Sequence, residues 1–305
     1  ADALVKELKS GAWTVSDVEE KIKNSHPKPP FTTSTLQQEA ARKIRSSARK
    51  TMRTAQRLYE QGFITYMRTD STSLSGEGIN GARNEILSRF GKEYLPEKPI
   101  FYASKVKNAQ EAHEAIRPAG VTFSSVDAVR SAIDEDAAKL YDLIRKRTLA
   151  SQMTSAKVKQ IGVTIENQKS EFRANGKVIL FPGYMAAYVE STDHRSGVTE
   201  DKETILPDMT KGQSLNCSEL TAEEHSTKPP ARFTEASLVK EMEAQGIGRP
   251  STFANIIDTI VYRTYVTRDR GKLTPTFLGV AVTQLLENHF TSLVDSQFTA
   301  NMEDG

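Results

Sequence analysis

Residues 29–44 read PPFTTSTLQQEAARKI, and residues 229–244 repeat the pattern as PPARFTEASLVKEMEA. Both copies place two prolines, then Thr and Ser or Thr, then a leucine at the start of a predicted helix. A second predicted helix follows in each copy, and after it comes FITYMRTD or RTYVTRD, which have the composition of a strand. Helix, turn, helix and strand is the outline of a helix-turn-helix or winged-helix unit. Two such units favour a nucleic-acid partner, although helix pairs also occur as plain packing units.

The length and composition indicate a globular protein of more than one domain. The chain has 305 residues, which exceeds the usual size of a single domain. Hydrophobic residues make up 37% and charged residues 26%, fractions that argue against the disordered and membrane-embedded classes. The single cysteine, Cys217, excludes an internal disulfide framework and a multi-cysteine zinc site, and it favours a reducing cytoplasm.

Helices are predicted mainly in the first half of the chain and again after Thr234, and most strands are predicted between residues 156 and 220. The predicted helices cover residues 3–9, 47–61, 77–90 and 125–151 and begin again after Thr234, and WTVSDVEEKIK at residues 13–23 predicts a strand. Between residues 156 and 220, KVKQIGVTIE, SEFRANGKVILFPGYMAAYVE and SLNCSEL alternate in hydropathy and contain Asn-Gly or Pro-Gly turns. The expected fold class is α+β and multidomain, with a β-rich part and two mainly helical domains that carry the helix-turn-helix or winged-helix units.

A first candidate for chemistry lies in GFITYMRTDS, residues 62–71. If this segment is a strand, Tyr66 and Arg68 lie on one face, about 7 Å apart along the strand. A phenol with a usual pKa of about 10 is a poor nucleophile unless its environment stabilises the anion or the transition state. The forked donors of an arginine match phosphate oxygens and can provide that stabilisation. The alternative is that Tyr66, one of nine tyrosines, fills the core.

Two further motifs carry groups that suit phosphate. In AQEAHEAIRPAG, residues 109–120, a helical turn would bring His113 and Arg117 to one side, although an exposed polar turn is the alternative. In GIGRPSTFANII, residues 246–257, Arg249 and Thr252 lie at a helix start where anions bind, although an ordinary helix start explains the same residues.

The segment RKIRSSARKTMRTAQR, residues 42–57, carries seven basic residues and no acidic residue. Such local density can neutralise phosphates. A solvated basic face of a helix is the alternative. The net charge of the whole chain, +2, does not decide between them.

Three stretches in this order resemble the type IA DNA topoisomerases, most closely the bacterial topoisomerase I branch. They are LYEQGFITYMRTDSTSLS, AQEAHEAIRP and KPPARFTEASLVKEMEAQGIGRPST. The resemblance implies that Tyr66 attacks one DNA strand and becomes joined to the 5′ phosphate, and that Arg68 positions the scissile phosphate. It implies that His113, Arg249 and Thr252 contact the DNA. The implied activity is ATP-independent relaxation of negatively supercoiled DNA by strand cleavage, strand passage and religation.

The same resemblance implies discontinuous domains. Residues 1–26 and 156–226 would form a β-rich arch, residues 27–155 the catalytic tyrosine domain, and residues 227–305 part of the domain that binds single-stranded DNA. In the family, Mg²⁺ is held by an acidic cluster of an N-terminal Toprim domain, and nothing in this chain matches that cluster. We therefore expect a fragment without a metal site, which folds but does not cleave DNA alone.

The expected partner is DNA, in single-stranded regions of negatively supercoiled molecules, and no membrane is expected. A monomer in the cytoplasm, associated with the nucleoid, is the expected state. Two alternatives remain at this point: a relative of the topoisomerase III or reverse gyrase kind, and a non-enzymatic DNA-binding module. The module would explain the repeat and the basic segment but not the order of the three motifs.

Overall fold

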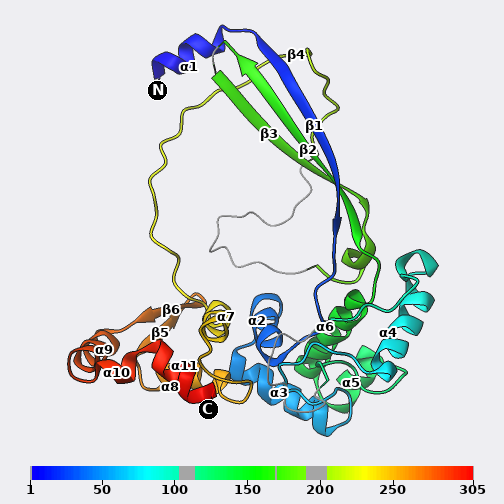
Figure 1. Cartoon of the computed structure of the whole chain (residues 1–305), viewed down its shortest axis with the longest axis vertical. Helices are drawn as coiled ribbons and strands as arrows, with labels where there is room; N and C mark the ends of the chain where they lie inside the picture. Colours follow the sequence, from blue (N-terminus) through cyan, green and yellow to red (C-terminus); the bar gives the residue numbers. More distant parts are fainter. Residues whose placement is uncertain (1, 103–113, 169, 190–204, 305) are drawn as a thin grey trace. The chain divides into compact units, whose positions relative to one another are not determined.

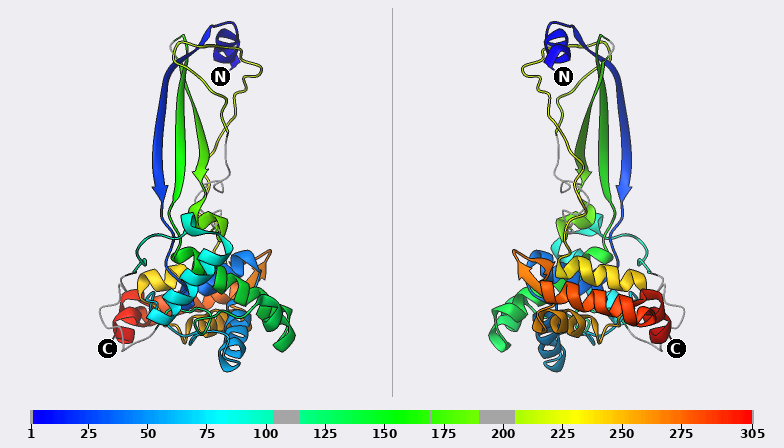
Figure 2. Two further views of the ribbon diagram at one scale, coloured as in Figure 1. Left: turned by 90° about the vertical axis from the view of Figure 1, so that its right-hand side faces the viewer. Right: turned by 90° about the vertical axis from the view of Figure 1, so that its left-hand side faces the viewer.

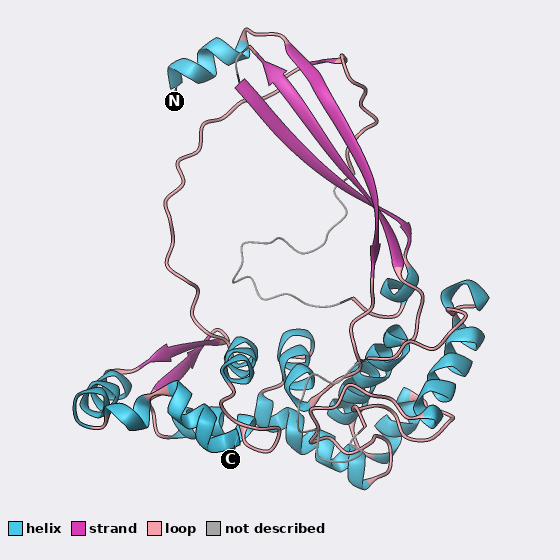
Figure 3. Ribbon diagram, in the orientation of Figure 1, coloured by secondary structure: helices cyan, strands magenta, loops and turns pink. Residues whose placement is uncertain are grey.

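The computed structural model describes residues 2–102, 114–168, 170–189 and 205–304 (Figure 1). Their contacts divide the chain into two units, each assembled from separate stretches of sequence. Unit 1 comprises Ala1–His26, Ser155–Gly183 and Gly197–Pro230, and unit 2 comprises Pro27–Thr154, Tyr184–Ser196 and Ala231–Gly305. Unit 1 holds the long strands and unit 2 most of the helices (Figure 3), so the α+β class is confirmed.

Unit 1 contains a four-stranded antiparallel sheet in the order β3-β2-β1-β4. Its elements are α1 (Asp2–Lys9), β1 (Trp13–Ser25), β2 (Ala156–Asn167), β3 (Ser170–Phe181) and β4 (Ser214–Leu215). The three long strands lie side by side in both views of Figure 2. Strands β1 and β2 pair from Trp13↔Asn167 to Ser25↔Ala156, with a register shift between Val15 and Asp17. The predicted strand at residues 13–23 is confirmed.

The turns predicted in the β-rich part are only partly correct. Asn175 and Gly176, predicted as a hairpin turn, lie inside β3, because the pairing of β2 with β3 already begins at Asn167↔Ser170. The segment predicted to continue as a strand into GYMAAYVE instead forms the short 3-10 helix η2 (Gly183–Ala186). Tyr188 then enters the core of unit 2, so burial of its ring takes the place of strand pairing.

Unit 2 is built from helices and one small hairpin. Its elements are α2 (Thr33–Lys43), α3 (Ala48–Glu60), α4 (Gly76–Arg89), η1 (Lys92–Tyr94), α5 (Val126–Ala132), α6 (Glu135–Ser151), α7 (Glu235–Gln245), α8 (Phe253–Tyr262), β5 (Val266–Asp269), β6 (Lys272–Pro275), α9 (Phe277–His289), α10 (Thr291–Val294) and α11 (Ser296–Asp304). The main core is formed by buried side chains of α2, α3, α6 and the loops between them, with Tyr141, Phe31 and Leu36 among the largest.

The predicted helix over residues 125–151 is two helices. Asp134 lies between α5 and α6 in an extended conformation, and its carboxylate accepts a hydrogen bond of 2.8 Å from the Ala137 amide. Arg57 of α3 forms an ion pair of 2.6 Å with the same carboxylate. An N-cap bonded to a neighbouring helix therefore interrupts a pattern that is continuous in hydropathy.

The two copies of the sequence repeat form equivalent helix pairs. Helices α2 and α7 both begin with a capping box, Thr32 with Thr35 and Thr234 with Ser237. Helix α2 packs on α7, and α3 packs on α8. The two copies therefore lie in one unit, and its division into a tyrosine domain and a DNA-binding domain stays a prediction.

Candidate active site

The GFITYMRTDS segment is an irregular loop and not a strand. Its single β-bridge joins Ile64 to Pro118. Ile64 and Met67 are buried, whereas Tyr66 is 38% exposed and Arg68 is exposed. The predicted alternation thus fails at Ile64, but Tyr66 and Arg68 do both reach the surface on either side of a buried methionine.

The start of α2 holds one side of this loop. The Thr33 hydroxyl donates to the carbonyl oxygens of Met67 (2.8 Å) and Thr69 (3.1 Å), and it accepts from the Thr69 amide (2.9 Å). The Thr33 amide also donates to the Thr69 carbonyl. Because a buried side chain takes these backbone groups, the loop needs no partner strand there.

Residues 115–119 hold the other side of the loop. The Thr65 amide donates to the Arg117 carbonyl and the Ala119 amide to the Phe63 carbonyl, both at 2.9 Å. The Thr65 hydroxyl donates to the Ala115 carbonyl at 2.8 Å and accepts from the Arg117 amide at 3.0 Å. Backbone contacts on both flanks thus fix the positions from which Tyr66 and Arg68 project.

The surroundings of Tyr66 and Arg68 suit a reacting group and a phosphate ligand. The Tyr66 ring meets the Tyr59 ring of α3 edge to face, with centroids 5.2 Å apart. Within the described residues Arg68 has no hydrogen bond or ion pair to another side chain. Because the residue is also exposed, its guanidinium donors are available to an approaching anion. No pattern in the sequence indicated the contact with Tyr59.

The HEAIRP motif has a positioning role at this site. Residues 114–118 are extended and not helical, so the predicted helical turn is wrong, and His113 lies outside the described residues. Arg117 is only 4% exposed and donates to both carboxylate oxygens of Glu114. Glu114 also accepts from the amide and hydroxyl of Ser75, the N-cap of α4. The pair therefore ties the loop-holding segment to the start of α4.

The chain makes room for this buried arginine. A side-chain carbon on Gly78 would lie 2.5 Å from Nε of Arg117. Further donors of the guanidinium reach the Pro118 and Gly120 carbonyl oxygens. Arg117 is thus satisfied inside the protein, so neither a phosphate contact nor the exposed polar turn considered from the sequence describes this position.

We expect replacement of Glu114 by glutamine to lower the free energy of unfolding by about 1.5 to 3 kcal/mol at neutral pH, the usual contribution of hydrogen bonds to a charged group. Burial raises the pKa of the Glu114 carboxyl, but hydrogen bonds from Arg117 and Ser75 outweigh it and hold the pKa below its ordinary 4.5. The stabilisation is therefore complete above pH 4.5 and is lost as the pH falls through the lower folded-state pKa.

Urea unfolding of both proteins at neutral pH and at a series of acidic pH values measures this. The two free energies of unfolding should converge on the acidic side. Glu93, which is exposed, provides the matched control Glu93→Gln, expected to change little. A difference between Glu114→Gln and the parent that stays constant down to acid pH would contradict the assignment.

The GIGRPST motif lies directly before α8, whose first residue is Phe253. Thr252 is its N-cap, and its hydroxyl accepts a hydrogen bond of 2.8 Å from the Arg249 amide. The Arg249 guanidinium donates to the Gly246 and Gly248 carbonyl oxygens and pairs with Glu303 of α11 at 3.3 Å. A DNA contact by Arg249 would therefore compete with these internal bonds, and the role of both residues stays a proposal.

The basic segment at residues 42–57 is largely neutralised by the protein itself. Four of its cations pair with carboxylates, namely Arg42 with Glu39, Arg49 with Asp258, Lys50 with Asp136 and Arg57 with Asp134. Two exposed arginines, Arg45 and Arg53, have no ion pair within the described residues. Three of the seven basic residues thus join α3 to α8 or to the start of α6, a role that neither sequence interpretation included.

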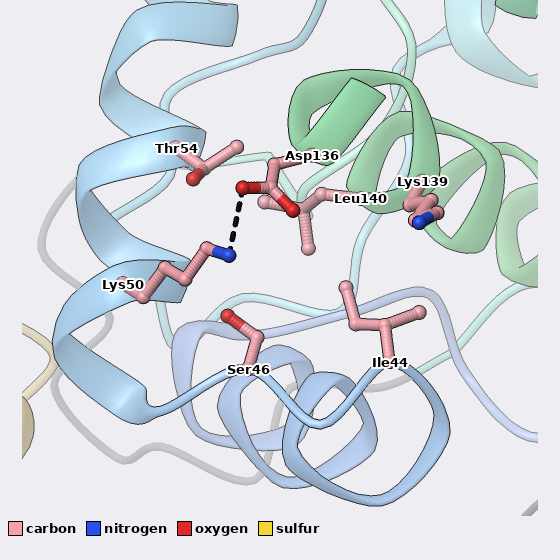
Figure 4. Close-up of a pocket in the computed structure, with 7 residues that line it drawn as sticks. All are labelled: Ile44, Ser46, Lys50, Thr54, Asp136, Lys139 and Leu140. Atoms are coloured by element: carbon pink, nitrogen blue, oxygen red, sulfur yellow. Dashed lines mark ion pairs between the residues drawn. The ribbon is translucent and has the colours of Figure 1, made fainter. Parts of the chain in front are cut away.

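A small pocket beside α3 shows the same pairing (Figure 4). It is lined by Ile44, Ser46, Lys50, Thr54, Asp136, Lys139 and Leu140. The Lys50–Asp136 ion pair of 2.7 Å crosses it. Its volume of about 50 Å³ admits a water molecule or two but no nucleotide.

The described residues contain no group of three or more His, Cys, Asp or Glu side chains that could hold a metal ion. The part of the chain described by the structure therefore does not fit the Mg²⁺ that the resemblance implies. Within the same residues, no helix is both long and apolar enough to cross a membrane.

Comparison with known proteins agrees with the motifs. A family model described as DNA topoisomerase matches residues 1–305. The chain belongs to the DNA topoisomerase family. It is 54% identical over 303 residues to DNA topoisomerase 1 of Synechococcus elongatus, covering 99% of this chain and 34% of that protein. It is 51% identical to DNA topoisomerase 1 of Mycobacterium leprae, covering 100% of this chain and 33% of that protein.

The fold agrees with a solved topoisomerase. The structure of full-length topoisomerase I from Thermotoga maritima matches with a TM-score of 0.83 and 38% identity, over 100% of this chain and 50% of that chain. These relatives, named DNA topoisomerase 1 or topoisomerase I, confirm the resemblance to the bacterial topoisomerase I branch of the type IA family. The chain spans about a third of the length of the curated relatives it matches.

Proposed function

We propose that this part of a type IA topoisomerase carries the DNA-cleaving nucleophile, Tyr66, for ATP-independent relaxation of negatively supercoiled DNA. The observation that supports it most is the placement of the tyrosine. Tyr66 is 38% exposed on a loop whose flanks are hydrogen-bonded on both sides, so the side chain can approach a phosphodiester without reordering of the backbone.

The proposed step joins the Tyr66 Oη to phosphorus while the bond from phosphorus to the 3′ oxygen breaks. The phenol gives up its proton, and the departing 3′ oxygen gains one. The 5′ phosphotyrosine keeps the energy of the phosphodiester, so attack by the 3′ hydroxyl reverses the step after strand passage. Arg68, exposed on the same loop, would bind the non-bridging oxygens and stabilise their charge.

The remaining roles belong to the same proposal. Single-stranded regions of DNA are the substrate, His113, Arg249 and Thr252 contact the strand, and the enzyme acts as a monomer in the cytoplasm at the nucleoid. Mg²⁺ is held by residues outside this chain. Residues 1–26 and 156–226 form the arch, 27–155 the tyrosine domain, and 227–305 part of the domain for single-stranded DNA.

Mapping the covalent adduct tests the proposal. In the longer protein that contains this chain, an oligonucleotide labelled on the 5′ phosphate at the cleaved position should transfer its label to protein. Proteolysis and mass spectrometry should place the label in the peptide that holds Tyr66. A label on another residue, or no transfer, would reject the assignment.

We expect the 305-residue chain alone to bind single-stranded oligonucleotide but to form no covalent adduct with it, with or without Mg²⁺, because the described residues offer no metal site. Binding is measured by fluorescence anisotropy, and cleavage by denaturing gel electrophoresis of end-labelled DNA. The longer protein, assayed beside it, is the positive control. An adduct formed by the 305-residue chain would contradict this expectation.

A further inference from the structure

The two repeat copies agree in hydrogen bonds far beyond their helices. Each of four backbone hydrogen bonds in the first copy has a counterpart in the second. In the first copy, the amides of Phe63, Gly62, Ile116 and Ala119 donate to the carbonyl oxygens of Leu58, Tyr59, Phe31 and Phe63, respectively. In the second copy, the corresponding donors are Tyr265, Thr264, Leu273 and Thr276, and their acceptors are Ile260, Val261, Phe233 and Tyr265. The bridge of Ile64 with Pro118 likewise matches the pair Val266↔Pro275.

These contacts match residues 62–64 of the Tyr66 loop with residues 264–266, and counting onward from them aligns the rest of the loop with the β5–β6 hairpin. Because Ile64 matches Val266, Tyr66 matches Arg268 and Arg68 matches Arg270. The hairpin of the two four-residue strands, residues 266–275, corresponds to the wing of a winged-helix unit in the second repeat copy, and we call it the wing. The second copy thus has a paired strand where the first has the irregular tyrosine loop, and it has arginine at the position of the proposed nucleophile.

The tip of the wing holds an arginine where turn geometry disfavours it. Arg270 and Gly271 join the strands, with φ of +47° and +80°. Positive φ at both central residues is the combination of a type I′ turn, which favours Asn-Gly. A non-glycine residue held there costs energy and often marks a functional site. Asparagine would suit this turn position better than arginine, so the turn geometry alone does not explain Arg270.

The charge of the wing points to a polyanion. Arg270 and Lys272 are exposed, and within the described residues neither side chain has a hydrogen bond or ion pair. Arg268 pairs with Glu235 at 2.6 Å, so it is already partly neutralised. Tyr262 at the end of α8 is 86% exposed. Exposed cations without internal partners suit a phosphate backbone, and exposed aromatic rings suit the bases of single-stranded nucleic acid.

We propose that the β5–β6 wing binds the sugar-phosphate backbone of single-stranded DNA through Arg270 and Lys272, holding a strand without cleaving it. This inference rests on the proposed function for the nature of the partner. It assigns a DNA contact separate from the Tyr66 loop and from Arg249 and Thr252.

The variant Arg270→Asn tests it without disturbing the turn, because Asn-Gly favours this geometry. With a fluorescein-labelled oligothymidylate of about 12 nucleotides, we expect the 305-residue chain carrying Arg270→Asn to bind about tenfold more weakly. The slope of log affinity against log salt should fall by about 0.7 for each phosphate that the variant no longer neutralises. The double variant with Lys272→Gln should lower the slope about twice as much.

Two controls separate charge from structure. Arg270→Lys keeps the charge and should retain the salt slope of the parent, and the thermal midpoint of Arg270→Asn should equal or exceed that of the parent. Arg173→Gln, which removes an arginine with a 74% exposed side chain from β3, should leave binding unchanged.

Any of three results would overturn the proposal for the wing. Arg270→Asn could keep the affinity and salt slope of the parent, Arg270→Asn and Arg270→Lys could lose affinity equally, or the parent chain could fail to bind the oligonucleotide. Failure of the proposed function is recognised separately. In that case the longer protein forms no adduct at Tyr66, whereas failure of the wing alone leaves the adduct in place.

Discussion

We expect replacement of Tyr66 by phenylalanine in the longer topoisomerase to reduce the covalent DNA adduct, and with it relaxation, by at least about 10⁴-fold. The variant lacks the only atom that can form the bond to phosphorus, and water cannot take its place without losing reversibility. The ring, and with it the edge-to-face contact to Tyr59, is retained. The adduct is measured by label transfer from DNA to protein, and relaxation by gel electrophoresis of supercoiled plasmid.

The matched control is Tyr59→Phe, which changes the neighbouring ring in the same way. Tyr59 is 41% exposed, so exposure alone does not distinguish the two tyrosines. We expect the control to keep adduct formation within about threefold of the parent, because it loses at most one solvent-exposed hydrogen bond. Equal losses of adduct in both variants, or activity in Tyr66→Phe, would remove Tyr66 as the nucleophile.

Replacing Arg68 by alanine slows cleavage about 10² to 10³-fold, the usual loss when a donor to developing charge is removed. Arg68 is exposed and has no ion pair within the described residues, so the substitution leaves no buried carboxylate unpaired. Protein stability should therefore stay within about 0.5 kcal/mol of the parent. Single-turnover cleavage of a labelled oligonucleotide measures the rate.

Arg68→Lys separates charge from geometry. Lysine keeps the charge but not the planar fork that contacts two phosphate oxygens, so we expect it to restore only part of the rate. Arg53→Ala is the control, because Arg53 is also exposed and without an ion pair in the described residues. Loss of DNA affinity with an unchanged cleavage rate would make Arg68 a binding residue only.

Local signals in the sequence predicted much of this fold correctly. Thr32 and Thr234 each cap a helix at the expected place, because a capping side chain bonds to amides two or three residues away. The long strand from Trp13 was also predicted, because its alternation is local. The same locality explains why Tyr66 and Arg68 were found as a pair.

Features that depend on distant partners were not predictable. The Tyr66 loop lacks a strand because the Thr33 hydroxyl takes its carbonyl oxygens. Residues 175–176 continue β3 because the register with β2 runs through them. In the sequence Arg117 suits a phosphate contact, whereas in the structure its guanidinium donates to Glu114 and lies against Gly78. Each outcome depends on groups brought together by chain folding.

The amino-acid order was sufficient for the family, for the starts of α2 and α7 and for the proposed nucleophile, since motifs, caps and periodicity are properties of neighbouring residues. Only the tertiary structure decided which charges face solvent. It paired most of the basic residues of α3 with carboxylates of α6 and α8 and left Arg68 and Arg270 exposed. The reason is that the environment of a charge depends on which groups lie within a few ångströms in space, and those groups come from anywhere in the chain.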